Sequence, residues 1–150
     1  MKSIEDIFVE EKVQEMKLYI QHGKVTTYQH CLNVMNQSER IDSLFNLKCN
    51  KENLKIGAFL HDFYLYDWHK KSPKLKDVGL FGMHGFTHPI IAATNAKQFF
   101  DVNDIVINII ESHMWPLTIT KIPKYKESWV VCIADKIVTV KESLNIKKKY

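Results

Sequence analysis

The apolar residues of this chain recur at intervals of three and four, the spacing that places side chains on one face of an α-helix. Six segments carry the pattern, in approximate bounds residues 3–21, 26–41, 50–62, 88–100, 103–113 and 126–144. Elsewhere, apolar and polar residues do not alternate for long enough to predict a strand. We therefore predict an all-α fold, a single compact helical bundle formed by one domain over residues 1–150.

The region between the third and fourth predicted helices is rich in proline, glycine and lysine. Proline is favoured in the first turn of a helix, so the pair His88-Pro89 predicts a helix start there. Residues 63–87 are predicted to be irregular. Their basic cluster is interpreted as a solvated loop, with a phosphate-attracting lid as the alternative. It consists of Lys70, Lys71, Lys74 and Lys76.

Four predicted helices each place a polar residue on an otherwise apolar face. These residues are His30, His61, His113 and Asp135. A lone histidine in such a position is usually a hydrogen-bonded core residue. A buried aspartate is different, because an interior carboxylate without a partner costs several kcal/mol. A divalent metal would compensate several of these groups at once, so the joint pattern predicts a metal site inside the bundle.

The histidines and aspartates follow one another in the order His30, His61-Asp62, His88, His113 and Asp135. This order resembles the HD-domain superfamily of metal-dependent phosphohydrolases. The resemblance covers about residues 22–142 and rests on the segments YQHCLNV, IGAFLHD, ESHMW and CIADK taken together. The His-Asp dipeptide alone would be too short to be specific. The layout is similar to a small bacterial branch of the superfamily with a two-metal ligand set.

The resemblance implies two divalent metal ions. The first would be held by His30, His61, Asp62 and Asp135, and the second by Asp62, His88 and His113. Asp62 would bridge the two ions, because a carboxylate has two oxygens. A His/Asp set without a thiolate suits Fe or Mn, and also Mg, Co, Ni or Zn.

Two histidines in the segment MHGFTHP compete for one place in this ligand set. We favour His88 because it is predicted to open a helix and because its distance along the chain to His113 matches the family pattern better than that of His84. His84, flanked by Gly85, would then face the substrate or support a ligand, with a loop residue of no chemical role as the alternative. With an unperturbed pKa of about 6.5 it could protonate a leaving group, so Asp62 and His84 are the predicted catalytic residues.

Four residues are predicted to contact the substrate: His69, His84, Trp115 and Lys136. Trp115 could stack on a base or a sugar ring, with a place in the core as the alternative. Lys136 follows Asp135 and could contact a phosphate or support the metal ligands. His69 belongs to the same candidate lid as the lysine cluster.

The resemblance favours hydrolysis of a small phosphorylated metabolite or nucleotide, with a metal-bridging hydroxide attacking phosphorus. Phe63-Tyr64-Leu65 stands where many signalling members have Ile-Gly-Lys, and the Glu-Asp pair of the stringent-response hydrolases is missing. Hydrolysis of cyclic dinucleotides or guanosine pyrophosphates is therefore not expected. Two alternatives stay open: an HD-fold di-iron oxygenase and a non-catalytic sensor that binds a nucleotide.

Composition narrows the partners and the compartment. The net charge is +4, and Arg40 is the only arginine. Proteins that read bases rely on arginine, so we expect a phosphorylated small molecule and no specific nucleic acid as partner. No apolar run approaches the roughly 18 residues that span a bilayer, and the acidic start does not resemble a signal peptide. Three cysteines without a CxxC motif predict reduced thiols in the cytoplasm. A homodimer is left open.

Overall fold

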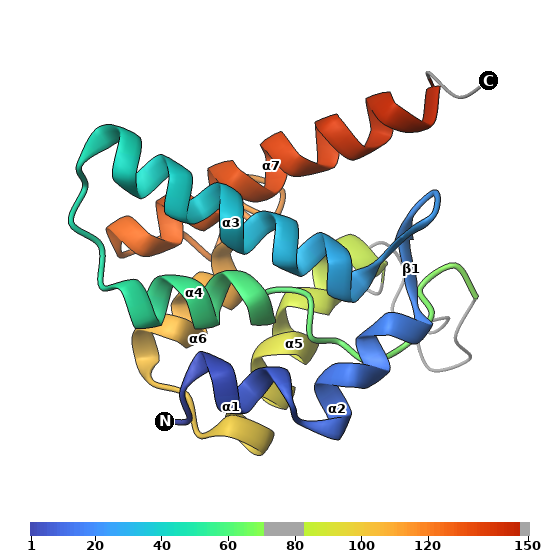
Figure 1. Ribbon diagram of the computed structural model, residues 1–150, viewed down its shortest axis with the longest axis horizontal. Coiled ribbons are helices and arrows are strands. Elements are labelled where there is room, and N and C mark those ends of the chain that lie inside the picture. The colour runs from blue at the N-terminus through green and yellow to red at the C-terminus, as the bar shows by residue number, and fades with distance from the viewer. Residues whose placement is uncertain (71–82, 148–150) are drawn as a thin grey trace.

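The computed structural model describes residues 1–70 and 83–147, and helices dominate it (Figure 1). The five longest are α3 (Thr27–Phe45), α4 (Lys51–Leu60), α5 (His84–Phe100), α6 (Asp104–Ser112) and α7 (Lys126–Lys147). In Figure 1, α3 and α7 run across the upper side of the bundle, with α4, α5 and α6 below them. Helix α4 packs against α3, α6 and α7, and α6 also packs against α5. The predicted all-α bundle is confirmed.

Polar caps explain why three of these helices begin where the sequence predicts. The side chain of Thr26 accepts a hydrogen bond from a backbone N–H in the first turn of α3. Asn50 and Asn103 do the same for α4 and α6. Such caps satisfy backbone donors that have no partner inside the helix.

The single helix predicted over residues 3–21 is wrong. The chain instead forms α1 (Ile4–Phe8), α2 (Glu11–Gln14) and a 3₁₀ helix, η1 (Glu15–Leu18). Ile7 and Val13 are both fully buried, yet they are six residues apart. On one straight helix they would point about 120° apart. The break between α1 and α2 lets both side chains reach the same core.

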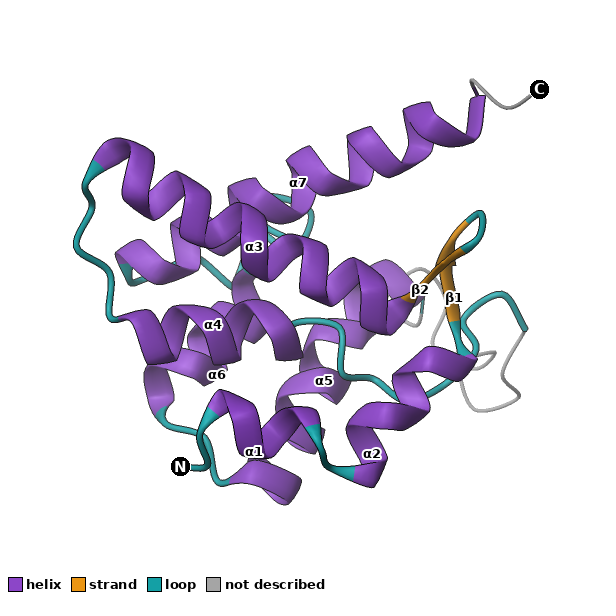
Figure 2. Ribbon diagram, in the orientation of Figure 1, coloured by secondary structure: helices purple, strands orange, loops and turns teal. Residues whose placement is uncertain are grey.

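A short hairpin, which the sequence analysis did not predict, follows η1 (Figure 2). Strands β1 (Ile20–His22) and β2 (Val25–Thr26) pair antiparallel, and they are too short to show a periodic pattern. Gly23 in the turn has a φ of 59°, a conformation that favours glycine. Strand β1 contacts both α3 and α7, which places its side chains beside the centre of the bundle.

Helix α5 begins at His84, so the predicted start at His88 is wrong and residues 84–87 are not irregular. Pro89 lies inside the helix and removes only the hydrogen bond that its missing N–H would make to the Gly85 carbonyl. The ring of His88 also donates from Nδ1 to the carbonyl of His84, at 2.6 Å. Lys71, Lys74 and Lys76 of the predicted basic cluster lie outside the described residues.

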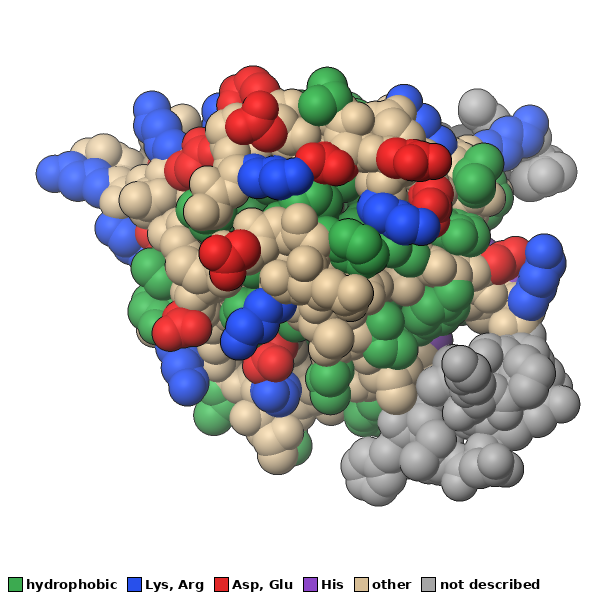
Figure 3. Space-filling model, turned by 90° about the horizontal axis from the view of Figure 1, so that it is seen from below, with side chains coloured by type: hydrophobic (Ala, Val, Ile, Leu, Met, Phe, Trp, Pro, Cys, Tyr) green, Lys and Arg blue, Asp and Glu red, His purple; other side chains and the backbone are tan. Residues whose placement is uncertain are grey.

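The molecular surface carries charges of both signs. On the face shown in Figure 3, lysine and acidic side chains are interspersed with apolar ones. All three cysteines are buried and unpaired. Within residues 1–70 and 83–147, none of the helices combines the length and the apolar character needed to cross a bilayer.

Candidate metal centre

The structure brings the six predicted metal ligands together in the interior. His30 lies in the first turn of α3, the pair His61-Asp62 follows α4, and His113 follows α6. Helices α5 and α7 supply His88 and Asp135. All six residues are buried, and the most exposed of them, Asp135, has 8% of its surface accessible.

Four ligand atoms form a first group. The Nε2 atom of His30 lies 3.1 Å from Oδ1 of Asp135 and 3.7 Å from Oδ2 of Asp62. The Nε2 atom of His61 lies 3.3 Å from the same Asp62 oxygen and 3.6 Å from the same Asp135 oxygen. Atoms that bind one ion at about 2.1 Å are separated by about 3 Å, so this spacing fits a shared cation.

A second group forms on the other oxygen of the same carboxylate. Oδ1 of Asp62 lies 3.2 Å from Nε2 of His88 and 3.5 Å from Nε2 of His113. The two histidine nitrogens are 2.9 Å apart. Asp62 therefore faces one donor group with each of its oxygens, which is the arrangement a bridging carboxylate needs.

Hydrogen bonds to backbone carbonyls orient three of the four histidine rings in the cluster. Nδ1 of His61, His88 and His113 lies 2.6–2.7 Å from the carbonyl oxygens of Ala58, His84 and Ile110 respectively. A carbonyl oxygen only accepts, so each of these Nδ1 atoms carries a proton. In its neutral form each ring would then direct the lone pair of Nε2 into the cluster, the form in which histidine binds a metal.

Two observations show that a cation fits the cluster. Nε2 of His61 and Oδ1 of Asp62 are buried and have no hydrogen-bond partner among the described residues. Nε2 of His88 and Nε2 of His113 face each other at 2.9 Å, although Nδ1 of each ring already donates to a backbone carbonyl. Buried polar atoms without hydrogen-bond partners are costly, and a divalent cation is the group that would satisfy them together.

Charge within the cluster shifts several pKa values. Burial opposes ionisation of Asp62, but His61 and His88 outweigh it and hold the pKa of this carboxyl well below its usual value. Burial also lowers the pKa of His30, but hydrogen bonds with Asp135 and Glu142 raise it to about 10. Burial also lowers the pKa of His61, but the charge of Asp62 and the hydrogen bond with Asp135 outweigh it and raise this pKa well above its usual value. Without a metal, His30 and His61 would therefore both hold a proton near pH 7.

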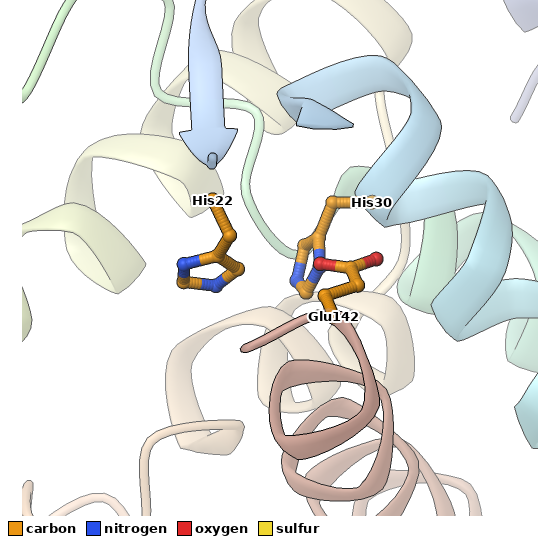
Figure 4. Close-up of side chains that lie close together, drawn as sticks. All are labelled: His22, His30 and Glu142. Carbon is orange, nitrogen blue, oxygen red and sulfur yellow. The ribbon is translucent and has the colours of Figure 1, made fainter. Parts of the chain in front are cut away.

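Glu142, near the end of α7, is a residue that the sequence analysis did not single out. Its Oε2 accepts from Nδ1 of His30 at 2.9 Å (Figure 4). Its Oε1 accepts from Asn33 at 3.0 Å. His22, at the end of β1, stands beside this pair with its ring 5.4 Å from that of His30. A carboxylate on the outer nitrogen of a ligand fixes its orientation and raises its basicity.

Gln21, in β1, is a second residue that the sequence analysis missed. Its side-chain amide donates to Oδ2 of Asp62 at 2.7 Å. Its carbonyl oxygen accepts from the hydroxyls of Tyr64 and Thr27. These bonds fix the amide so that its N–H₂ points at the carboxylate. In the sequence, Gln21 was only a polar residue at the end of the helix predicted over residues 3–21, and the structure has no helix at that position.

The distance between α4 and α6 is set by a glycine. A Cβ built on Gly57 would lie 2.5 Å from Cδ1 of Ile109, so only glycine allows this approach. Gly57 and Ile109 each precede a ligand, His61 and His113, by four residues, or about one helical turn. Close packing at this level brings the two ligand rings to a centroid separation of 4.8 Å.

His84 lies against the cluster rather than within the ligand set. Its ring stacks on His88 at 4.4 Å and on Trp68 at 5.0 Å, and its Nδ1 is 2.8 Å from the hydroxyl of Tyr66. Burial first, and then the charge of His88, lower the pKa of His84 to about 3. Its ring is therefore neutral near pH 7.

The other three predicted substrate contacts lie differently. Trp115 packs edge-on against Trp129 and is not among the described residues that line the cavity at the centre. His69 is largely exposed beside Asp67 and is likewise not among them. Lys136 does line the cavity, but its ammonium donates to the carbonyl oxygens of His113 and Cys132 and to the Cys132 sulfur. Lys136 thereby joins α7 to the turn that carries His113.

A cavity of about 690 Å³ connects the cluster with solvent. Its volume is in the range of small-molecule sites in proteins. Four of the six clustered residues line it: Asp62, His88, His113 and Asp135. A molecule of metabolite size could therefore reach the cluster.

Comparison with known proteins agrees with this geometry. The family model described as HD domain matches residues 27–139, which include all six clustered residues. The chain therefore belongs to the HD-domain family. No curated protein and no solved structure matches the chain. The matched residues begin after the hairpin and end before Glu142, so Gln21 and Glu142 both lie outside them.

Proposed function

We propose that this HD-domain protein is a metal-dependent phosphohydrolase that acts on a small phosphorylated metabolite or nucleotide. The observation that supports it best is the placement of Asp62, whose two oxygens face two separate groups of buried nitrogen and oxygen donors. The cavity makes the same carboxylate accessible to a small molecule. The family match supports the class of reaction, because many HD domains hydrolyse phosphate esters.

The donor groups define which residues would hold two divalent ions. His30, His61, Asp62 and Asp135 would hold one, and Asp62, His88 and His113 the other. Bound there, the ions would activate water near neutral pH and offset negative charge on a phosphoryl group. All other contributions come from the side chains of the chain itself.

The protein's residues position the reaction. Glu142 and Gln21 hold His30 and Asp62 in place, so the site is organised before the substrate arrives. His84 lines the cavity as a neutral ring. In the tautomer that accepts from the Tyr66 hydroxyl at Nδ1, the other nitrogen of His84 would carry the proton and could donate a hydrogen bond to the leaving oxygen. In this role His84 is a neutral hydrogen-bond donor, whereas the sequence analysis expected a positively charged ring that protonates the leaving group.

The test measures phosphate release from a panel of phosphate monoesters with added Mn²⁺, Fe²⁺ or Co²⁺. Asp62→Asn keeps the size of the side chain but removes the charge between the two groups, and we expect at least about a 100-fold loss of turnover. Asp101→Asn, at the exposed left-handed end of α5, is the matched control and should retain activity.

Equal turnover by the wild type and Asp62→Asn would contradict the proposal. Oxygen uptake without phosphate release would instead assign the chain to the oxygenases of this fold. Binding of nucleotide without turnover would assign it to the sensors.

A further inference from the structure

The wall of the cavity beyond the metal centre is mostly apolar, although His22 and Thr139 are among its members. Met114, Pro116, Leu117 and Val140 line it together with Trp68. The first four side chains have no strong hydrogen-bonding group. Leu117 and Val140 expose 48% and 57% of their surface, so this apolar wall is open to solvent and not buried by the described protein.

The described lining offers no free cation for extra phosphate groups. Apart from the histidines, Lys136 is its only basic residue, and the three donors of its ammonium all have acceptors within the protein. A chain of phosphates needs several lysine or arginine contacts outside the metal centre. The described part of the cavity therefore suits a ligand with a single phosphoryl group.

The same wall disfavours a nucleoside as the organic part of the ligand. Ribose hydroxyls and the edge of a base would leave water and find no partners on side chains such as Leu117 and Val140. An alkyl or aryl group would lose no hydrogen bonds there and would cover apolar surface that is now wet.

From this lining we infer that the protein takes a phosphate monoester with an apolar organic body, its phosphoryl group at the metal centre and its body against the wall of Leu117 and Val140. The inference rests on the proposed function and narrows its substrate class. It selects an apolar metabolite over a nucleotide within that class.

The test is calorimetric binding of unbranched alkylphosphonates, from ethyl to octyl, to the protein loaded with Mn²⁺. These compounds are not phosphate esters, so binding is measured without turnover. We expect Kd to fall about three- to fourfold for each added methylene over the first few, since each one leaves water for an apolar wall. Adenosine monophosphate should bind more weakly than hexylphosphonate.

Two matched pairs of variants locate the effect. Val140→Asn and Leu117→Asn place a polar group on the wall and should flatten the dependence of Kd on chain length. The controls are Leu144→Asn, on the same helix as Val140, and Ile119→Asn, two residues after Leu117. Both replace exposed apolar residues that are not among the described residues lining the cavity, so the dependence of Kd on chain length should stay unchanged. A dependence that is absent in the wild type, or flattened equally by all four substitutions, would overturn the inference. So would tighter binding of adenosine monophosphate.

Hydrolysis of the corresponding alkyl phosphates separates this inference from the proposed function. Their leaving groups are alkoxides of similar basicity, so kcat/KM should rise with chain length for the same reason as binding. Hydrolysis without that rise refutes the apolar ligand alone. Chain-length-dependent binding of phosphonates with no hydrolysis of any ester refutes the phosphohydrolase alone.

Discussion

Replacing Gly57 by alanine tests whether the contact between α4 and α6 positions the metal ligands. The new Cβ would lie 2.5 Å from Cδ1, 2.7 Å from Cγ2 and 2.9 Å from Cβ of Ile109. Rotating the side chain of Ile109 cannot relieve the last contact, because Cβ is fixed to its backbone. The helices must move apart, and with them His61 and His113, one turn further along each helix.

The magnitude follows from two opposing effects. Overpacking of a dense core costs about 1–3 kcal/mol. Alanine in place of glycine inside a helix returns up to about 1 kcal/mol. Because the close contacts include a branch point, we expect the cost to dominate and the free energy of unfolding to fall by about 1–2 kcal/mol. For a chain of this length that lowers Tm by about 2–8 °C.

Gly85→Ala in α5 is the matched control. Its Cβ would meet Cδ2 of Leu117 at 3.2 Å, the end of a flexible and half-exposed side chain. We expect its Tm to be unchanged or slightly higher. Both variants are measured by thermal unfolding with a chelator, and then by titration with Mn²⁺. A Gly57→Ala protein as stable as Gly85→Ala would refute the packing argument. Lower stability with unchanged Mn²⁺ affinity would refute its link to the ligands.

Three further predictions concern the groups around the ligands. Glu142→Gln removes the carboxylate charge at Nδ1 of His30 and should weaken Mn²⁺ binding by about 10–100-fold, measured in competition with a chelator. Unchanged Mn²⁺ affinity would contradict this role of Glu142. Gln21→Met leaves Asp62 without its buried amide donor and should lower the free energy of unfolding of the metal-free protein by about 1–3 kcal/mol. Gln98→Met, at an exposed position, should have little effect. Equal losses of stability in the two variants would contradict the role of Gln21. The pKa of His30 is raised to about 10 by Asp135 and Glu142 against the effect of burial, and the pKa of His61 is also raised well above its usual value, so both rings are protonated in the metal-free protein at pH 7.5. Mn²⁺ binding should therefore release about two protons, one from each ring, and affinity should rise with pH up to about 10. Calorimetry in two buffers of different ionisation enthalpy measures that release, and equal heats in both would show that the two rings are already neutral.

The helices with regular apolar spacing were predictable from the sequence, because the burial of one apolar face is enough to specify them. Apolar residues at helical spacing lie in the helices that the structure contains, and asparagine and threonine caps mark where three of them begin. The apolar spacing breaks between Ile7 and Val13. The prediction continued one helix across this break, where the structure has a turn between α1 and α2. At Pro89 the local preference for a first turn was overridden, because a proline inside the helix removes only one backbone hydrogen bond, the one to the Gly85 carbonyl.

The sequence alone determined that several histidines and aspartates would point into one helical interior, since a His or Asp on an apolar face must be buried with it. Only the tertiary structure decided that Asp62 faces two donor groups, because that depends on the distance between α4, α5 and α6. It also decided that Gln21 and Glu142, which come from a short hairpin and from the far end of α7, support the two ligands. Contacts between segments more than forty residues apart leave no local periodicity, so one sequence could not reveal them.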